Sequence, residues 1–363
     1  MTQDPGPQDP TPEPTDSGGS EPADSPAPAS ESDTDSATGS STRAEKQKPG
    51  CLKVGCLTLV SMFLVIALAI GGIALYVNHE LGNVQRSDQL LPAGGPGRDA
   101  AAGDAQNILL LGSDSRGTNL RENGRSDVIQ LMHIAKGQRR IQIVHFPRDM
   151  YVAIPGHGMN KINAAYAFGG SKLLVTTLQN LLDVHIDHVA QIGFDGFKKL
   201  TDAMGGVNIY VPIAFDEKGN GSWTKGYHQM NGAQALGFSR ERHQLPRGDL
   251  DRGVDQQQWI DAMATKALSR GTLTNPKRAL DMISAIAPYM LVDMSTTDLL
   301  ELAVSLRATG KDAISYYSAP ISGFANTKAG AVDVVDMPKV QQLGSNLRTD
   351  TMSKTALEPN TVG

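Results

Sequence analysis

The pattern of apolar and polar positions divides the chain into stretches of different character. Residues 1–53 are rich in Pro, Ser, Thr, Asp and Glu, residues 54–77 are uncharged and strongly apolar, and a globular pattern begins at about residue 105. A polar, acidic segment cannot bury enough apolar surface to offset the entropy lost on ordering. We therefore predict that residues 1–53 form a disordered acidic tail.

The apolar run 54–77 predicts a transmembrane helix. At about 1.5 Å per residue it is long enough to cross a hydrocarbon core of roughly 30 Å. A signal peptide is the alternative, but the run is too long, begins far from residue 1 and is not followed by a small-residue cleavage site. Basic residues are denser before the run than after it. The positive-inside rule then predicts a single-pass protein of the cell membrane, with a cytoplasmic N-terminus and an extracytoplasmic domain.

Apolar runs and segments of helical period alternate through residues 105–340, after an expected linker at 78–104. Strands are expected at 107–111, 128–134, 141–146, 188–193 and 207–211, and helices at 172–182, 195–204, 232–238 and 251–269. This alternation is typical of a layered α/β domain. The pattern weakens over 276–340, and the polar residues 341–363 predict a flexible C-terminal tail.

Composition narrows the classes of function. The formal net charge is -5, but residues 1–50 hold ten of the 38 acidic residues and three of the 33 basic ones, so the folded part is close to neutral. Without a broad basic surface, we expect no nucleic acid partner. Both cysteines, Cys51 and Cys56, lie at the start of the apolar run. The folded domain therefore has no disulfide, cysteine-based zinc site or thiol nucleophile.

Polar clusters flank three consecutive predicted strands. The first strand is followed by Asp114 and Arg116, the second is preceded by Arg125 and Asp127, and the third is followed by Arg148 and Asp149. Each cluster alone is also typical of an ordinary surface loop with a solvated salt bridge. Because short connections can bring the three strand ends together, and binding loops commonly leave strand ends in open α/β sheets, we expect these side chains to form one site.

A fourth cluster lies near the long predicted helix. Arg240 and Arg242 point to the same side of an extended segment, and Arg252 and Gln256 share a helix face at i, i+4. Apolar residues continue the same helical stripe. Taken alone, this is also the pattern of an ordinary amphipathic helix with a charged first turn.

These residue types suit the binding of a multiply charged anion. Arginine pairs with phosphate oxygens through a planar fork that stays charged. Asp114 and Asp127 offer the ligand atoms that Mg²⁺ prefers, since this ion usually takes one or two carboxylates with phosphate oxygens and water. Metal and arginines together would stabilise charge on a transferring phosphoryl group.

The clusters, in this order, resemble the LytR-CpsA-Psr family of cell-wall glycopolymer transferases. The resemblance runs from about residue 107 to 258 through the segments NILLLGSDSRG, GRSDVIQLMHI, FPRDMYVAIPG, NKINAAYAFGG, MGGVNIYV, KGYHQMNGAQALGFSRERH and GDLDRGVDQQQ. It implies a three-layer α/β/α sandwich around a central mixed sheet, preceded by one transmembrane helix. It also implies transfer of a glycan phosphate from a polyprenyl-pyrophosphate carrier in the membrane lipid to peptidoglycan, at the 6-hydroxyl of N-acetylmuramic acid.

The resemblance assigns roles residue by residue. Asp114 and Asp127 would bind Mg²⁺ or Mn²⁺, and Asp249 would orient arginines. The pyrophosphate would be held by Arg116, Arg125, Arg148, Arg240, Arg242, Arg252 and Gln256. Asp127 and Arg148 would be catalytic. The motif does not settle the general base, for which Asp127 is a candidate.

Three positions depart from the family pattern. Asp255 stands where similar proteins often have Arg, and Val128 and Met150 stand where Thr or Ser is common. We expect Asp255 to remove one positive charge from the site or its rim. An alternative therefore stays open, in which a non-catalytic or regulatory membrane protein holds the polyprenyl pyrophosphate without turnover.

Overall fold

The structure is a computed structural model that describes residues 75–76, 78–115, 117–120, 126–217, 221–269, 271, 275–360 and 362 of the 363-residue chain. The expected tail 1–53 and all of the expected membrane span 54–77 except two residues lie outside these ranges. Among the helices that are described, none combines the length and the apolar character needed to cross a membrane.

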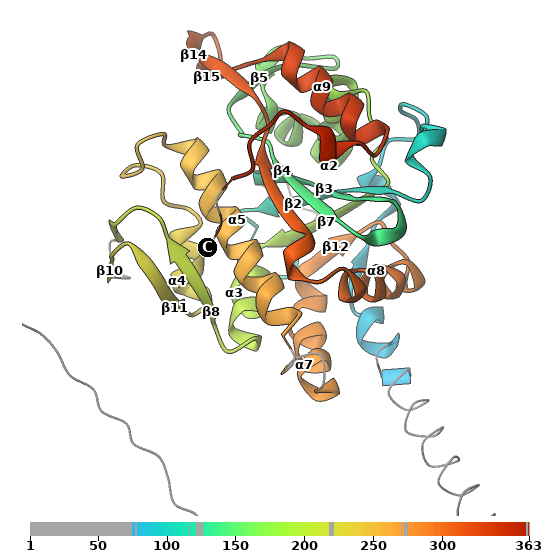
Figure 1. The fold of residues 1–363 in the computed structure, drawn as a ribbon, viewed down its shortest axis with the longest axis vertical. Helices are drawn as coiled ribbons and strands as arrows, with labels where there is room; N and C mark the ends of the chain where they lie inside the picture. Colours follow the sequence, from blue (N-terminus) through green and yellow to red (C-terminus); the bar gives the residue numbers. More distant parts are fainter. Residues whose placement is uncertain are drawn as a thin grey trace, which may run out of the picture. The chain divides into compact units, whose positions relative to one another are not determined.

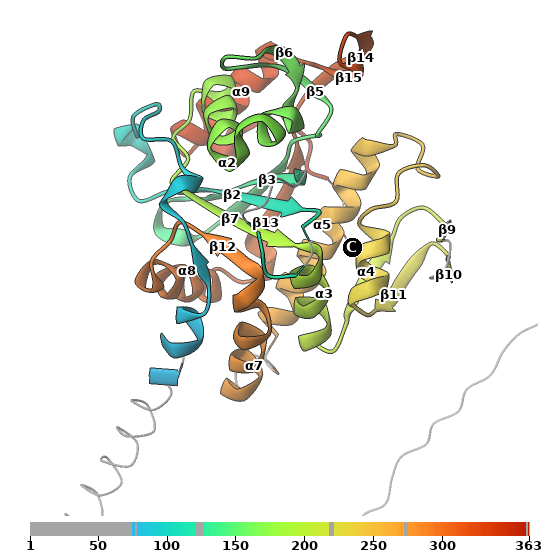
Figure 2. The same ribbon diagram turned by 180° about the vertical axis from the view of Figure 1, so that it is seen from behind.

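A mixed sheet forms the centre of the described domain (Figures 1 and 2). Its seven described strands lie in the order β1-β12-β7-β2-β3-β4-β13. They are β1 (Gln85–Arg86), β2 (Gln106–Ser113), β3 (Ser126–Ile134), β4 (Ile141–His145), β7 (His188–Gly193), β12 (Met290–Val292) and β13 (Ile314–Ser318). Strand β3 is antiparallel to both β2 and β4, whereas β7 is parallel to β2 and β13 is parallel to β4. The predicted α/β class with a central mixed sheet is confirmed.

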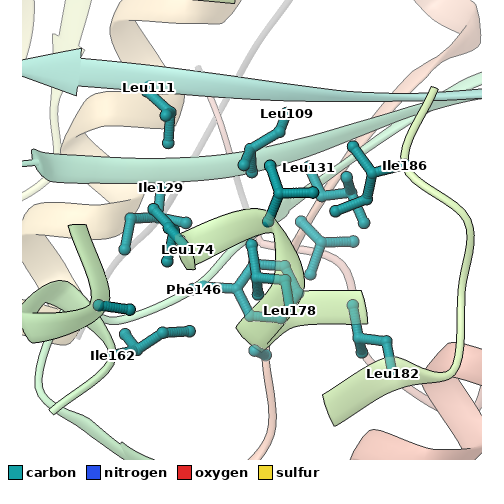
Figure 3. Close-up of a cluster of buried hydrophobic side chains, with 14 of the residues drawn as sticks. Leu109, Leu111, Ile129, Leu131, Phe146, Ile162, Leu174, Leu178, Leu182 and Ile186 are labelled. Carbon is teal, nitrogen blue, oxygen red and sulfur yellow. The ribbon is translucent and has the colours of Figure 1, made fainter. Parts of the chain in front are cut away.

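Alternating side chains of the central strands create a core on each face of the sheet. Leu109 and Ile129 face helices α2 (Ile162–Leu182) and α9 (Met337–Arg348), in the cluster that Figure 3 draws. Ile108 and Met132 point the other way, into a cluster that includes residues of α5 (Asp249–Ala267), α7 (Pro276–Ile286) and α8 (Thr296–Thr309). Each fully buried aliphatic side chain contributes about 1.5–3 kcal/mol, so both faces stabilise the sheet that carries the site.

Smaller units complete the described domain. A second sheet has the order β14-β15-β5-β6, and two ribbons pair β8 with β11 and β9 with β10. These strands are β5 (Met150–Ile154), β6 (Gly158–Lys161), β8 (Val207–Val211), β9 (Phe215–Glu217), β10 (Gly221–Trp223), β11 (Gly226–Met230), β14 (Ile321–Thr327) and β15 (Gly330–Val335). The remaining helices are α3 (Phe194–Ala203), α4 (Gly232–Phe238) and the short 3-10 helices η1 (Asp88–Leu90), η2 (Ala100–Ala102), η3 (Lys136–Gln138), η4 (Ala287–Tyr289), η5 (Lys311–Ala313) and η6 (Met352–Lys354).

The predicted strands and most of the predicted helices are confirmed, with boundaries displaced by at most two residues. Helix α2 is the exception, because it begins at Ile162 whereas a helix was expected only over 172–182. Gly169 and Gly170 have non-helical backbone angles inside it. This break interrupts the apolar period, so the sequence pattern predicts only the second half of the element.

The expected linker 78–104 packs against the domain instead. Leu81, Val84 and Leu90 are buried, and β1 extends the central sheet parallel to β12. The Arg86 guanidinium donates hydrogen bonds to three backbone carbonyls, among them that of Met294 at 3.1 Å. The apolar residues of this segment are isolated between Gly, Pro and polar residues, so no periodic pattern predicts their burial.

The expected flexible tail 341–363 is also wrong over much of its length. Helix α9 continues to Arg348, and Val340, Leu343 and Leu347 are buried at helical spacing against the core that contains α2. A Cβ at Gly344 would lie 1.9 Å from the carbonyl oxygen of Leu182, so only glycine permits this approach of the two helices.

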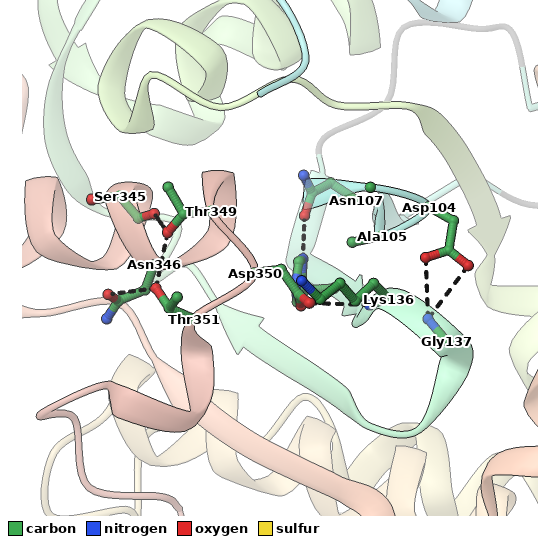
Figure 4. A network of polar contacts seen from close by, with 12 residues as sticks. Asp104, Ala105, Asn107, Lys136, Gly137, Ser345, Asn346, Thr349, Asp350 and Thr351 are labelled. Carbon is green, nitrogen blue, oxygen red and sulfur yellow. Dashed lines mark hydrogen bonds and ion pairs between the residues drawn. The ribbon is translucent and has the colours of Figure 1, made fainter. Parts of the chain in front are cut away.

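A polar network holds the end of α9 to the central sheet (Figure 4). The buried His133 ring contacts Asn107 Oδ1 at 2.8 Å through Nδ1 and Asp350 Oδ1 at 3.0 Å through Nε2. Asp350 also accepts the Lys136 backbone N–H at 3.3 Å. Burial lowers the pKa of His133, and the hydrogen bond and charge of Asp350 oppose this effect. The His133 ring links β2, β3 and the segment after α9.

Candidate active site

The predicted site forms where β2 and β4 end and β3 begins. Gly112 pairs with Val128 and Ser113 pairs with Ser126, which leaves Asp127 as the extra residue of a β-bulge. A bulge bends its strand and redirects a side chain, and such features are common beside active sites. The bulge therefore gives a local reason why the Asp127 carboxylate reaches the loop after β4.

Arg148, in that loop, is surrounded by carboxylates. Its Nη1 donates to Asp127 Oδ1 at 2.6 Å, and its Nε lies 3.3 Å from Asp249 Oδ1 and 3.7 Å from Asp149 Oδ2. Burial alone would lower the pKa of Arg148, but the Asp127 hydrogen bond and the nearby carboxylates outweigh it and raise the pKa. The guanidinium thus stays charged at the mouth of the site.

Asp249 joins Arg148 to Arg252. It lies in the first turn of α5 and forms an ion pair with Arg252 three residues later, and the two side chains are 11% and 6% exposed. Burial raises the pKa of Asp249, although the charges of Arg252 and Arg148 oppose this effect. Asp249 thus lies between the two guanidinium groups, and its role in orienting them for a substrate stays a prediction.

The ion pairs leave hydrogen-bonding capacity unused. Within the described residues, Arg148 Nε and the Nε and Nη2 atoms of Arg252 are buried and make no well-aligned hydrogen bond. Unpaired buried donors are costly. Guanidinium groups held in place with N–H groups that lack a well-aligned acceptor are suited to donate to the oxygens of a phosphate group.

Arg240 and Arg242 lie in the turn and loop after α4, rather than in the extended segment that was expected. The Arg240 guanidinium lies 4.8 Å from the centroid of the Phe194 ring, in a cation–π contact. Glu241 Oε1 accepts three backbone N–H groups of the same loop, including that of Arg242 at 2.8 Å. In the described part of the chain neither arginine has a carboxylate partner.

A cavity of about 610 Å³ connects these arginines to an apolar surface. Its polar lining includes Asp127, Arg148, Arg240, Arg242, Arg252 and Gln256. Its apolar lining includes Ala190, Phe197, Leu200, Leu236, Trp259, Ile260, Ile286 and Met290. From Arg252 to Ile260 the lining follows α5 for roughly 12 Å at 1.5 Å per residue. The helix thus presents a polar first turn and an apolar continuation to one cavity, as the sequence predicts.

The remaining predicted residues have different outcomes. Asp114 directly follows β2, on the same edge of the sheet as Asp127, but it does not line the cavity. Arg116 and Arg125 lie outside the described residues. Among the residues described, no group of three or more His, Cys, Asp or Glu side chains is arranged to hold a metal. Two carboxylates at one edge still fit Mg²⁺, which completes its shell with phosphate oxygens and water.

Sequence reasoning missed the buried polar layer behind the arginines. His145 is fully buried, and burial together with the charge of Arg252 lowers its pKa to about 3, so the ring is neutral. A Cβ at Gly253 would lie 2.1 Å from His145 Cδ2. Gln257 Nε2 donates to the Tyr317 carbonyl at 2.8 Å. Gly253 is the feature of the sequence that could have predicted this layer, since a glycine inside a helix indicates that another group packs closely against the helix backbone.

Asp255 differs from its expected role. Its side chain is 1% exposed, lies outside the lining of the cavity and makes no hydrogen bond with any described residue. Burial, reinforced by the charges of Asp251 and Glu241, raises the pKa of Asp255 well above its ordinary value. The residue is therefore enclosed in the protein rather than placed at the rim of the site.

Comparisons with known proteins agree with this geometry. The LytR_cpsA_psr family model matches residues 78–349. The probable cell wall biosynthesis protein LcpB of Corynebacterium glutamicum is 32% identical over 310 residues, which cover 81% of this chain and 72% of that protein. The polyisoprenyl-teichoic acid–peptidoglycan teichoic acid transferase TagU of Enterococcus faecalis is 34% identical over 202 residues, which cover 55% of this chain and 65% of TagU.

Solved structures show the same fold. TagT bound to LI-WTA has a TM-score of 0.58 and 25% identity, covering 72% of this chain and 98% of that one. Bacillus subtilis TagV has a TM-score of 0.58 and 26% identity, covering 68% and 97%. The family match, the relatives and the ordered arginine and aspartate motifs show that this chain belongs to the LytR-CpsA-Psr family.

Proposed function

We propose that the protein is a phosphotransferase that moves a glycan phosphate from a polyprenyl-pyrophosphate carrier to peptidoglycan. The observation that carries this proposal is one cavity in which a cluster of arginines, two of them with buried N–H groups that make no well-aligned hydrogen bond, continues into an apolar surface. A pyrophosphate linked to a long hydrocarbon chain has the same two chemical parts in the same order. The name of the relative TagU, a teichoic acid transferase, supports the same class of reaction.

Arg148, Arg252, Arg240 and Arg242 would hold the pyrophosphate, with Gln256 beside them. The first two are already fixed by Asp249, so little side-chain entropy is lost when the donor binds. Among the described residues, the other two have no carboxylate partner to displace. Phe197 and Trp259, stacked with ring centroids 4.0 Å apart, would contact the first prenyl units. Each buried CH₂ group of the lipid contributes about 0.8 kcal/mol.

In the reaction, an oxygen of the acceptor, proposed to be the 6-hydroxyl of N-acetylmuramic acid, forms a bond to the phosphorus next to the glycan. The bond from that phosphorus to the bridging oxygen breaks, and polyprenyl phosphate leaves. The hydroxyl proton passes to a base, for which the Asp127 carboxylate is our candidate. Arg148 would stabilise the charge on the phosphoryl oxygens.

We also propose that Asp114 and Asp127 hold Mg²⁺ or Mn²⁺. The ion would neutralise charge on the pyrophosphate when it is bound. Their oxygen ligands at one sheet edge match the preference of a hard divalent cation. Arg116 and Arg125, on the adjacent loops of the sequence, would add further contacts to the donor.

A membrane location completes the proposal. Residues 54–77 would form a single transmembrane helix, with the N-terminus in the cytoplasm and the catalytic domain outside. This arrangement would keep the domain on the side of the membrane where peptidoglycan lies, close to its lipid-linked donor.

The test uses the full-length chain with a polyprenyl-pyrophosphate glycan, Mg²⁺ and peptidoglycan fragments. Mass spectrometry follows the glycan and the released polyprenyl phosphate. We expect glycan phosphate on the acceptor, and its loss in Arg148→Ala. Tight donor binding without any product, with a donor that a related enzyme turns over, would contradict the transferase and favour the non-catalytic lipid-binding alternative. Release of the glycan phosphate into water without acceptor would identify hydrolysis by the same site.

A further inference from the structure

A second cavity, of about 520 Å³, lies at the edge of the central sheet opposite Arg148. It lies where β4 and β13 begin, and its lining includes Gln142 of β4. An extended strand rises about 3.3 Å per residue, so Gln142 and His145, the last residue of β4, are roughly 10 Å apart, and Arg148 lies in the loop beyond. The two cavities have no lining residue in common, so this cavity is separate from the proposed donor site.

The floor of the cavity is formed by polar side chains, on a face of the central sheet that is apolar further along the strands. Gln142 pairs directly with Ser315 of β13, and Tyr317 lies on the same face two residues further on. Beyond them this face carries Val144 and Phe146, which belong to the core beneath α2 and α9. Polar side chains at such positions are costly unless they find hydrogen-bond partners.

Gln142 lacks such a partner. The residue is 4% exposed, and its Oε1 atom is buried and accepts no hydrogen bond from any described residue. Native structures pair almost all buried acceptors, either with protein or with ordered water. An acceptor of this kind in the lining of a cavity is therefore available to a donor from outside the chain, either a water molecule or a ligand hydroxyl.

The walls supply further uncommitted groups. Arg140, Asp312 and Glu358 line the cavity, are exposed, and within the described chain their side chains form no ion pair or hydrogen bond. One wall is formed by Met352, Ser353 and residues 355–359. The backbone N–H of Asn360, which follows this wall, donates to the Tyr316 carbonyl at 2.7 Å. The cavity is thus closed by a segment that is fixed to β13.

We propose that this cavity binds a short, uncharged saccharide. Two carboxylates against one guanidinium disfavour an anion, and the polar floor disfavours a lipid. Among the described residues, no cluster of three metal-ligating side chains occurs here. A sugar hydroxyl both donates and accepts, so it can donate to Gln142 Oε1 and to the carboxylates while accepting from Arg140. The volume is in the range of small-molecule sites, about 300–1,000 Å³.

The test measures saccharide binding to the full-length chain by saturation-transfer NMR. The two probes are an N-acetylglucosamine tetramer and maltotetraose. We expect at least one to bind, with binding weakened about tenfold or more in Gln142→Leu, which removes the acceptor at similar volume. Binding of the amino-sugar tetramer alone would identify a wall-type glycan, and binding of both would show recognition of hydroxyl groups in general.

Two controls make the result decisive. Arg148→Ala should bind the saccharide as the wild type does, because Arg148 lines the donor cavity and not this one. The saccharide proposal can therefore be tested even if the transferase proposal fails. Gln142→Leu should melt at or above the wild-type temperature, because it removes an unpaired acceptor. If it fails to fold, Ser315→Val, which fills the floor from the paired strand, replaces it. Absence of binding by both probes, or unchanged binding in the variants, would overturn the proposal and leave a water-filled cavity.

Discussion

The carboxylate of Asp127 lies 2.6 Å from Nη1 of Arg148, so a β-bulge and the loop after β4 meet in one ion pair. Both side chains line the donor cavity and are partly exposed, at 27% and 17%. A charged pair at the edge of a cavity can exchange partners when a ligand arrives. Arg148 is therefore available to phosphate oxygens, and Asp127 is available to a metal or a proton.

Asp127→Asn should lower kcat much more than it raises the KM for the lipid donor. The change removes a negative charge from beside Arg148, so the attraction of the pyrophosphate is maintained or increased. Loss of a general base typically costs about 10²–10⁴-fold in rate. Steady-state kinetics with Mg²⁺ titration check this, with Asp149→Asn as the matched control in the next loop. Normal turnover in Asp127→Asn would contradict both its base and its metal role.

Leu236→Asn should weaken use of the lipid-linked donor without affecting the chemistry. Leu236 belongs to the apolar lining of the donor cavity. A polar amide there disfavours contact with a prenyl chain, so KM should rise about tenfold while kcat is retained, which corresponds to roughly 1.4 kcal/mol. A donor analogue with a single isoprene unit is the control, because it should show a smaller difference between variant and wild type. Equal effects on both donors would show that the prenyl chain lies elsewhere.

Gly253→Ala should destabilise the protein by about 1–3 kcal/mol or more, as overpacking does. The new Cβ would lie 2.1 Å from Cδ2 of His145, whose ring is fully enclosed and has no space to move. Denaturant unfolding of the two proteins measures the difference.

Gly82→Ala is the matched control for this substitution, because a Cβ at Gly82 meets no atom within 4 Å. It should leave the free energy of unfolding unchanged or slightly increased. Similar stability in Gly253→Ala and Gly82→Ala would mean that α5 and β4 are not in such close contact.

The sequence alone was sufficient to predict the features that repeat with a period or that form a contiguous cluster of residues. The strands around Leu109 and Ile129 and the polar start of α5 belong to this class. The packing of Leu81 was not predictable in this way, because it depends on distant segments that supply the opposing surface. Leu347 shares a helical spacing with Val340 and Leu343, but the polar residues between them concealed this pattern. The burial of Asp255 was not predictable for the same reason as the packing of Leu81, since its position in a motif does not show which face of α5 is covered by the rest of the protein.

Removal of residues 78–104 should destabilise the domain. The deletion exposes the surface covered by Leu81, Val84 and Leu90, each of which contributes about 1.5–3 kcal/mol when buried. It also leaves β12 as an edge strand, without β1. We expect a chain that begins at residue 105 to melt well below one that begins at residue 78. Equal melting temperatures would support the linker interpretation that the structure replaces.

Asp255→Asn should stabilise the protein at neutral pH and remove part of its pH dependence. The pKa of Asp255 is raised in the folded state above its ordinary value of 3.8, so the folded protein retains a proton that the unfolded chain releases. Such a group contributes stability below the unfolded pKa and loses it as the pH rises towards the folded pKa. The variant and the wild type should therefore differ least near pH 4, and the advantage of asparagine should grow as the pH increases. Denaturant unfolding between pH 4 and 8 measures this, with Asp281→Asn, at an exposed position, as the control. A stability difference that is independent of pH would show that the Asp255 carboxyl is not protonated in the folded protein.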